Sequence, residues 1–225
     1  MQGNTHRVGG MLCALAGYSL LESKGMLIGN VSPLLQLTVI YPFALYGSTF
    51  PDLDHHSESA PSKDIVSVIV NRVLHLTSGI RKSTGKSNPV LKIFDAQHRS
   101  WQTHSDLFLL ICIALSAFLI GSSSVDANGI ILKLVAVGFI LGVISHMILD
   151  MLTPQGIWSV VLVGISKVLG FKKFPQKISL VPKAKFFSTG SKWEDLIRYL
   201  MWIVCFILLA RILYLMSPYR INFSL

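Results

Sequence analysis

The stretch of sequence that decides the fold is residues 130–154, which read IILKLVAVGFILGVISHMILDMLTP. Its first part is an almost unbroken apolar run in which Lys133 is the one charged residue. A hydrocarbon core about 30 Å thick needs about 20 apolar residues in a helix, so residues 130–150 predict a membrane-spanning helix. The run ends in a polar group around His146 and Asp150. Ionisable residues next to a span are costly and generally have a function.

The composition of the whole chain agrees with a membrane protein. Of the 225 residues, 52% are apolar and only 14% are charged, whereas a typical soluble domain carries about 25% charged residues. Four further segments predict spans, at residues 8–29, 33–50, 107–122 and 196–216. We therefore expect an all-α, multi-pass transmembrane helical bundle of about five spans, formed by a single domain over residues 1–225.

Three weaker signals complete the outline of the chain. Glu22 and Lys24 interrupt the first apolar segment, which leaves open whether it spans fully. That segment lacks a small-residue cleavage pattern, which argues against a removed signal peptide. Segments 64–80 and 157–171 predict helices that lie in the membrane interface or pack under the bundle. The cysteines lie in apolar runs without a C-x-x-C pair, so we expect small core residues at Cys13, Cys112 and Cys205.

Polar clusters stand where the predicted spans begin or end. They consist of His6, of Asp52 with Asp54 and His55, of His98 with Arg99 and His104, and of His146 with Asp150. With five spans, all of these clusters fall on one side of the membrane, and Glu194, ahead of the last span, joins them. A count that is wrong by one in the middle would divide the clusters between the two sides.

The basic residues indicate which side this is. Most of the 20 Lys and Arg residues lie in connections 51–106 and 151–195, whereas the loop 122–129 contains none. The positive-inside rule places the clusters on the cytoplasmic face. The net charge of +9 would also attract anionic headgroups there, unless the lysines only set the topology. The chain has no compact basic domain, so we expect no nucleic-acid partner.

The spacing of the acidic residues and histidines suits metal ligands. His146 and Asp150 are four residues apart, so on a helix they project from one face, as two ligands of one ion or as a His held by its carboxylate. Asp52 and Asp54 follow Pro51 in an expected extended turn, where both carboxylates can point at one cation. The alternatives are a buried His–Asp pair that only locks helices together and a solvated turn at the membrane boundary.

A third cluster precedes the third predicted span, where His98 and His104 flank Arg99. Imidazole suits zinc, and a guanidinium group presents a planar fork to phosphate or carboxylate oxygens. A cation beside a guanidinium is what a phosphoester substrate requires. Trp101 in the same stretch also fits an interfacial belt, which is compatible with that role.

Together these motifs resemble the YdjM-like family, inner-membrane proteins described as LexA-regulated, metal-dependent hydrolases. The resemblance rests on His6 with Gly9 and Gly10, on Gly47 through His55, on His98-Arg99 with Thr103-His104-Ser105, on His146 through Gly156, and on Thr189-Gly190-Ser191 with Glu194. It covers nearly the whole chain. The resemblance implies a membrane-bound hydrolase with a metal centre, located in the cell inner (plasma) membrane.

These observations predict a membrane-bound, metal-dependent hydrolase that cleaves a phosphoester of a lipid or lipid-linked substrate at the cytoplasmic face. One or two divalent cations, zinc first with manganese and magnesium as alternatives, lower the pKa of bound water. The expected ligands are His6, Asp52, Asp54, His104, His146 and Asp150. His98 is the expected proton donor or a further ligand, Arg99 the clamp on the anion, and Glu194 a ligand or a base.

Two other classes of function remain open. A membrane metal-ion or proton transporter without hydrolytic activity would also place His and Asp in its spans, although here they gather at one edge. A metal-free phosphatase that works through a phosphohistidine also carries a His-x-x-x-Asp element, but this chain lacks the Pro-Ser-Gly-His segment that accompanies it. The sequence leaves the oligomeric state open.

Overall fold

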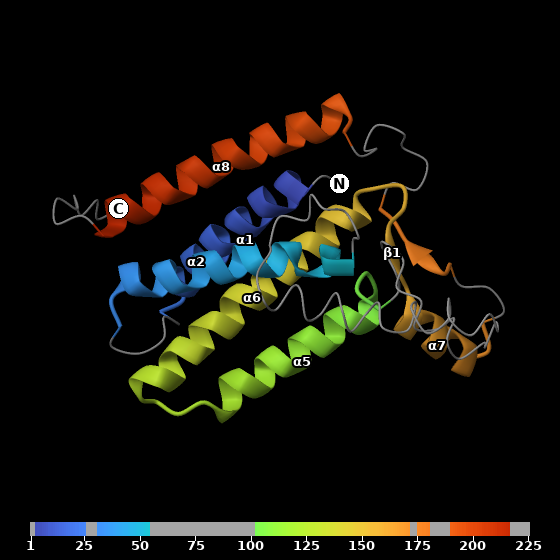
Figure 1. Ribbon diagram of the computed structural model, residues 1–225, viewed down its shortest axis with the longest axis horizontal. Coiled ribbons are helices and arrows are strands. Elements are labelled where there is room, and N and C mark those ends of the chain that lie inside the picture. Colours follow the sequence, from blue (N-terminus) through green and yellow to red (C-terminus); the bar gives the residue numbers. More distant parts are fainter. Residues whose placement is uncertain (1–2, 26–30, 55–101, 172–174, 181–189, 217–225) are drawn as a thin grey trace, which may run out of the picture.

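The computed structural model describes residues 3–25, 31–54, 102–171, 175–180 and 190–216, and these residues are mainly helical. Five long helices lie lengthwise beside one another (Figure 1). They are α1 (Gly3–Ser23), α2 (Pro33–Thr49), α5 (Asp106–Ser122), α6 (Ala127–Met151) and α8 (Lys192–Met216). Each corresponds to one of the five apolar segments found in the sequence, so the helical architecture is confirmed in the described part of the chain.

Two of these helices, α6 and α8, are long and apolar enough to cross a membrane, at 25 residues each. Helix α5 is apolar but shorter, with 17 residues. Large apolar side chains point outward, as in Phe118 of α5 and Phe206 of α8, which are 68% and 64% exposed. Such side chains suit contact with lipid better than contact with water. The arrangement of five spans itself stays a prediction.

The direction of the chain alternates from helix to helix, so one end of the bundle collects specific helix ends. The first turns of α1, α5 and α8 and the last turns of α2 and α6 lie at the end near the strand β1 (Figure 1). Helix α1 begins earlier than the predicted span 8–29, so that His6 lies inside the helix rather than before it. Thr5 and His6 in its first turn are polar yet buried, which a search for apolar residues does not detect.

Glycines allow α2 and α6 to approach closely, and these two helices share the most extensive helix–helix interface described. A Cβ atom on Gly142 would clash with the carbonyl oxygen of Ala44 and the backbone nitrogen of Ser48. A Cβ atom on Gly47 would likewise clash with the carbonyl oxygen of Phe139. Small residues permit this backbone contact between membrane helices. The close crossing brings the end of α2 beside the end of α6.

The segment after α2 is a 3₁₀ helix, η1 (Phe50–Asp54), and the predicted extended turn is wrong. Pro51 restricts φ to a value that a helical turn accepts as readily as an extended one. A 3₁₀ helix has three residues per turn, whereas side chains in an extended segment alternate with a period of two. The side chain of Asp54 lies outside the described residues.

A small two-stranded antiparallel sheet follows α6 and was not predicted. It pairs β1 (Ile157–Trp158) with β2 (Lys177–Ile178), and α7 (Val160–Val168) follows β1. The helix predicted over residues 157–171 therefore begins only after a strand. Gly156 has a φ of 59°, and a Cβ atom there would clash with the carbonyl oxygen of Ile178, so this turn requires glycine. The other predicted interfacial helix, at residues 64–80, lies outside the described residues.

Candidate metal centre

Five of the predicted ligands lie together at the end of the bundle where the helix ends gather. They are His6 of α1, Asp52 of η1, His104 ahead of α5, and His146 and Asp150 of α6. The three histidines and Asp150 are fully buried, whereas the side chain of Asp52 is 24% exposed. The cluster is therefore enclosed by protein except on the side of Asp52.

Asp150 lies at the centre of this cluster. Its Oδ2 atom is 3.5 Å from Nε2 of His146 and 3.6 Å from Nε2 of His104. Its Oδ1 atom is 3.6 Å from Nε2 of His6. These separations exceed the usual N–H···O distance of 2.7–3.2 Å. One carboxylate thus faces three imidazole nitrogens without a close hydrogen bond to any of the three.

Asp52 closes the cluster from the exposed side. Its Oδ1 atom is 3.3 Å from Nε2 of His104 and 3.8 Å from Nε2 of His146. Burial alone would raise the pKa of Asp52, but the electrostatic interaction with His146 and the hydrogen bond with His104 outweigh burial and hold the pKa of this carboxyl well below its usual range. The carboxyl group of Asp52 is therefore ionised at neutral pH and faces the cluster with a charged oxygen.

Groups outside the cluster orient two of the imidazole rings. Nδ1 of His146 is 2.7 Å from the carbonyl oxygen of Ser48. Because a carbonyl only accepts, Nδ1 carries the proton, and Nε2 keeps its lone pair free for an ion. Nδ1 of His104 is 2.9 Å from Oγ1 of Thr103, which allows the same arrangement. Metal-binding histidines are typically held in this way through their other ring nitrogen.

The third ring, that of His6, has a different environment. Neither of its nitrogens makes a hydrogen bond with any residue in the described ranges, although the side chain is fully buried. The ring stacks on His146, with centroids 3.8 Å apart and planes inclined by 15°. Two charged imidazolium rings would repel each other in that position. A neutral His6 whose Nε2 binds an ion would satisfy a nitrogen that otherwise has no partner there.

The donor set and its spacing fit a small divalent cation. In a tetrahedral zinc site with bonds of about 2.0–2.1 Å, neighbouring ligand atoms are about 3.3–3.4 Å apart. The Nε2 atoms of His104 and His146 are 3.3 Å apart, and the nitrogen–oxygen separations range from 3.3 to 3.8 Å. Imidazole nitrogens with carboxylate oxygens are ligands that zinc and other first-row metals accept.

The ligands form two overlapping groups of three. One contains His6, Asp52 and His146, and the other contains His104, His146 and Asp150. His146 belongs to both groups, but its Nδ1 atom is already bonded to Ser48. Its single remaining nitrogen can bind one ion, so His146 could not bridge two.

Glu194 lies at the same end of the bundle as the cluster but belongs to neither group of three. One carboxylate oxygen accepts a hydrogen bond of 2.8 Å from Thr5, the residue before His6. The other accepts a hydrogen bond of 2.7 Å from the backbone nitrogen of Gly190. The side chain is 1% exposed. Glu194 thus ties the first turn of α8 to the first turn of α1, and its predicted role as a ligand or base stays a prediction.

The remaining predicted residues, His98 and Arg99, lie outside the described residues, as do the side chain of Asp54 and all of His55. Sequence reasoning missed two contributions, the carbonyl oxygen of Ser48 and the hydroxyl group of Thr5. A backbone carbonyl has no signature in the sequence. Thr5 was noticeable only as a polar neighbour of His6.

Comparison with known proteins gives one match. The sequence model of the family described as YdjM inner membrane protein matches residues 1–221. No curated protein matches the chain significantly. No solved structure matches it significantly either.

Proposed function

The chain belongs to the YdjM inner membrane protein family, and on that premise we propose that it is a membrane-bound, metal-dependent hydrolase of the phosphoric ester class. Its proposed substrate is a phosphoester of a membrane lipid or a lipid-linked molecule, cleaved at the cytoplasmic face. The observation that carries the proposal is the meeting of three imidazole nitrogens and two carboxylates in one buried cluster. A structural lock between helices needs one His–Asp pair, not five ionisable groups from four segments.

Three or four of the five side chains would hold one divalent cation, with zinc the first choice, so that a position stays open for water. When bound, the cation would lower the pKa of a water molecule toward neutrality and polarise a phosphoryl oxygen. His6, His104 and His146 offer Nε2 atoms, and Ser48 and Thr103 fix the orientation of two of those rings. Asp52 lies at the exposed side, where an incoming substrate would meet the site. Asp54 remains a predicted ligand.

Residues next to this cluster in the sequence complete the proposal. Arg99 precedes His104 by five residues, and its guanidinium fork would bind the phosphoryl oxygens bidentately. His98 would donate a proton to the leaving oxygen. An anionic substrate at this surface also agrees with the net charge of +9.

Transport of metal ions or protons is the competing function. A transport path needs polar groups along the depth of the bundle. Farther along the bundle from the end that holds the cluster, the core is formed by apolar side chains that include Ala14, Leu15, Ile40, Ala44 and Leu134. This apolar layer favours hydrolysis over transport for the described part of the bundle.

A direct assay tests the proposal. Purified protein in lipid nanodiscs is loaded with Zn²⁺ and incubated with lipid phosphomonoesters and phosphodiesters, and released phosphate or headgroup is measured. We expect turnover that a strong chelator abolishes and that His146→Ala removes. Uptake of Zn²⁺ into proteoliposomes without hydrolysis of any tested phosphoester would instead support the transporter.

A further inference from the structure

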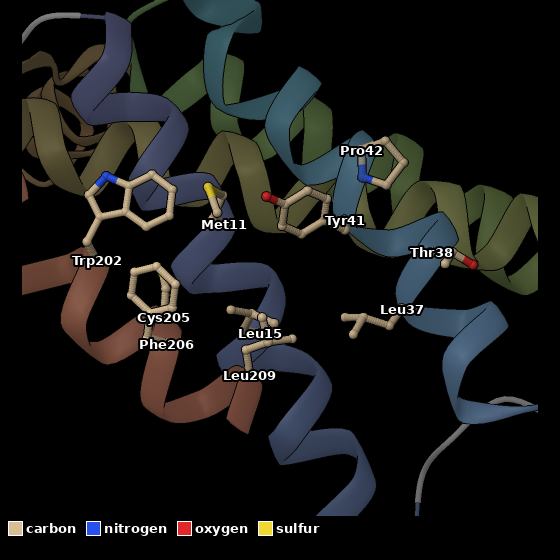
Figure 2. A pocket seen from close by; sticks show the side chains of 10 residues that line it. All are labelled: Met11, Leu15, Leu37, Thr38, Tyr41, Pro42, Trp202, Cys205, Phe206 and Leu209. Carbon is tan, nitrogen blue, oxygen red and sulfur yellow. The ribbon is translucent and has the colours of Figure 1, made fainter. Parts of the chain in front are cut away.

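A groove lined by apolar side chains runs along α1 between α2 and α8 (Figure 2). Its base is formed by Met11 and Leu15 of α1, and its walls include Leu37 and Tyr41 of α2 and Phe206 of α8. The cavity measures about 490 Å³, which lies within the range of about 300–1,000 Å³ of small-ligand sites.

The groove exists because α2 and α8 both pack on α1 and diverge from each other there. Its α8 wall belongs to a helix that is long and apolar enough to cross a membrane. Phe206 and Leu209 on that wall are 64% and 36% exposed, so the groove is open toward the hydrocarbon that would surround α8. An empty groove would leave its lining without contacts, so in a bilayer a hydrocarbon chain fills it.

The groove lies on helices that also carry or border the candidate metal centre, a short distance along them from the cluster. Met11 lies five residues after His6 on α1, which is about 7.5 Å along the helix axis. Trp202, another lining residue, follows Glu194 by eight residues on α8, or about 12 Å. Pro42 of α2 also lines the groove, and Asp52 follows it by ten residues, toward the end of the bundle that holds the cluster. The groove therefore extends from just below the cluster toward the middle of the bundle.

Resting on the proposed function, we propose that this groove binds an acyl chain of the lipid substrate and so places its phosphoester at the metal centre. In a lipid the phosphate headgroup lies at the membrane surface and the acyl chain extends inward from it. The cluster and the groove follow each other in the same order along the helices. Exchange of bilayer hydrocarbon for an apolar groove changes little in solvation, because lipid tails are as apolar as the lining. The groove accordingly contributes position, while contacts of the anionic headgroup with the cluster would supply the affinity, and a misplaced substrate reacts slowly.

Photo-cross-linking tests where the chain binds. Full-length protein in phosphatidylethanolamine–phosphatidylglycerol nanodiscs receives a trace of phosphatidic acid that carries a diazirine in its acyl chain, and adducts are mapped by peptide mass spectrometry. We expect adducts to concentrate on α1, α2 and α8 at the groove. Even labelling of the groove and of the exposed α5 positions Leu115 and Phe118 would show ordinary annular lipid and would overturn the proposal.

A groove-filling variant and a matched control extend the test. Thr38→Trp places a large ring at an exposed position of the lining, and Leu34→Trp places the same ring one turn earlier on α2, outside the lining. We expect Thr38→Trp to reduce groove labelling and the kcat/KM of long-chain substrates by about tenfold to a hundredfold, the range caused by small misplacements. Leu34→Trp should leave both unchanged. Equal effects of the two variants would contradict the assignment.

Metal content separates this proposal from the proposed function. Thr38→Trp should retain the metal content of the unmodified protein, since position 38 is far from the ligands along α2. If the unmodified protein binds no metal but labels selectively in the groove, the hydrolase proposal fails and the groove remains a lipid site. If it binds metal and hydrolyses lipid phosphoesters without selective labelling, the groove proposal fails alone.

Discussion

Single residues in the cluster have separable roles, because those that would bind an ion are distinct from those that hold them in place. His146 and His104 face the centre with Nε2, and Ser48 and Thr103 receive or share the hydrogen bond at Nδ1. Such outer contacts are commonly worth about tenfold to a hundredfold in metal affinity. The hydrogen bond from Thr5 to Glu194 touches none of the rings directly. It holds the residue before His6 in place.

Replacement of Glu194 by Gln tests whether this residue positions His6 or binds the ion. We expect Glu194→Gln to lower the free energy of unfolding by about 1–3 kcal/mol, because it weakens buried, charge-assisted hydrogen bonds to Thr5 and Gly190. Metal affinity should fall by about tenfold to a hundredfold. Asp195→Asn is the control, since Asp195 is paired with Arg198 at the surface and should matter by less than about 1 kcal/mol.

Chemical unfolding in detergent and titration with Zn²⁺ measure the two effects of Glu194→Gln. A complete loss of metal binding, equal to that of a variant at Asp150, would mean that Glu194 is itself a ligand.

The affinity for metal should depend on pH with a definite sign. Imidazole must be neutral to bind an ion, and its ordinary pKa is about 6.5, so affinity should fall as the pH drops from about 7.5 to about 5.5. The carboxylate of Asp52 stays ionised through this range, because its pKa is held below the usual value. Titrations with Zn²⁺ in buffers across this range check the expectation. A constant affinity would exclude histidine ligands.

At the scale of helices, the site depends on how closely α2 and α6 cross. The Ser48 carbonyl reaches His146 because Gly142 and Gly47 lack side chains at the contact. This close contact could not be predicted from the sequence, since a glycine in an apolar run does not indicate which helix packs against it. The lengths of α5, α6 and α8, in contrast, follow from their apolar composition.

Gly142→Ala should therefore damage both stability and metal binding. The added Cβ atom meets backbone atoms of Ala44 and Ser48, which cannot move as a side-chain tip can, and overpacking of this kind costs about 1–3 kcal/mol. Gly121→Ala is the matched control on α5, where an added Cβ atom meets nothing within 4 Å. Thermal unfolding in nanodiscs and metal titration are the measurements. If the two variants behave alike, the close crossing does not hold the site.

Short elements explain where sequence-based prediction failed. The strands β1 and β2 have two residues each, too few for an alternating pattern to appear. The 3₁₀ turn at Asp52 was missed because Pro51 is compatible with both helical and extended backbone. The lengths of the apolar runs and the composition thus located the five helices and the polar clusters, while the turns that connect them and the contacts that orient the rings depend on tertiary packing.

At the scale of the whole molecule, the alternation of the helices matters most. His6, Asp52, His104 and His146 are far apart in the chain, and they meet because helix directions reverse from one to the next. The sequence predicted this gathering from the number of apolar segments alone. It also predicted, from the basic connections, that this end faces the cytoplasm.

Cysteine labelling tests that orientation. In a chain whose three cysteines are replaced by alanine, Val125→Cys marks the α5–α6 loop, where Val125 is 87% exposed, and Gln155→Cys marks the end with the cluster. We expect a membrane-impermeant maleimide added to intact cells to label Val125→Cys, and to label Gln155→Cys only after the membrane is opened. The reverse pattern would place the cluster on the outer face.

The presence of the metal ion is the claim on which the proposed chemistry depends most directly. Elemental analysis of the purified protein, reconstituted with Zn²⁺ and washed, should give about one ion per chain, because the ligands share one position. Asp150→Asn removes the charge at the centre of the cluster without changing its shape, and it should leave almost no bound metal, whereas Asp195→Asn should bind like the unmodified protein. An unmodified protein without stoichiometric metal, or an Asp150→Asn variant that keeps it, would contradict the metal centre.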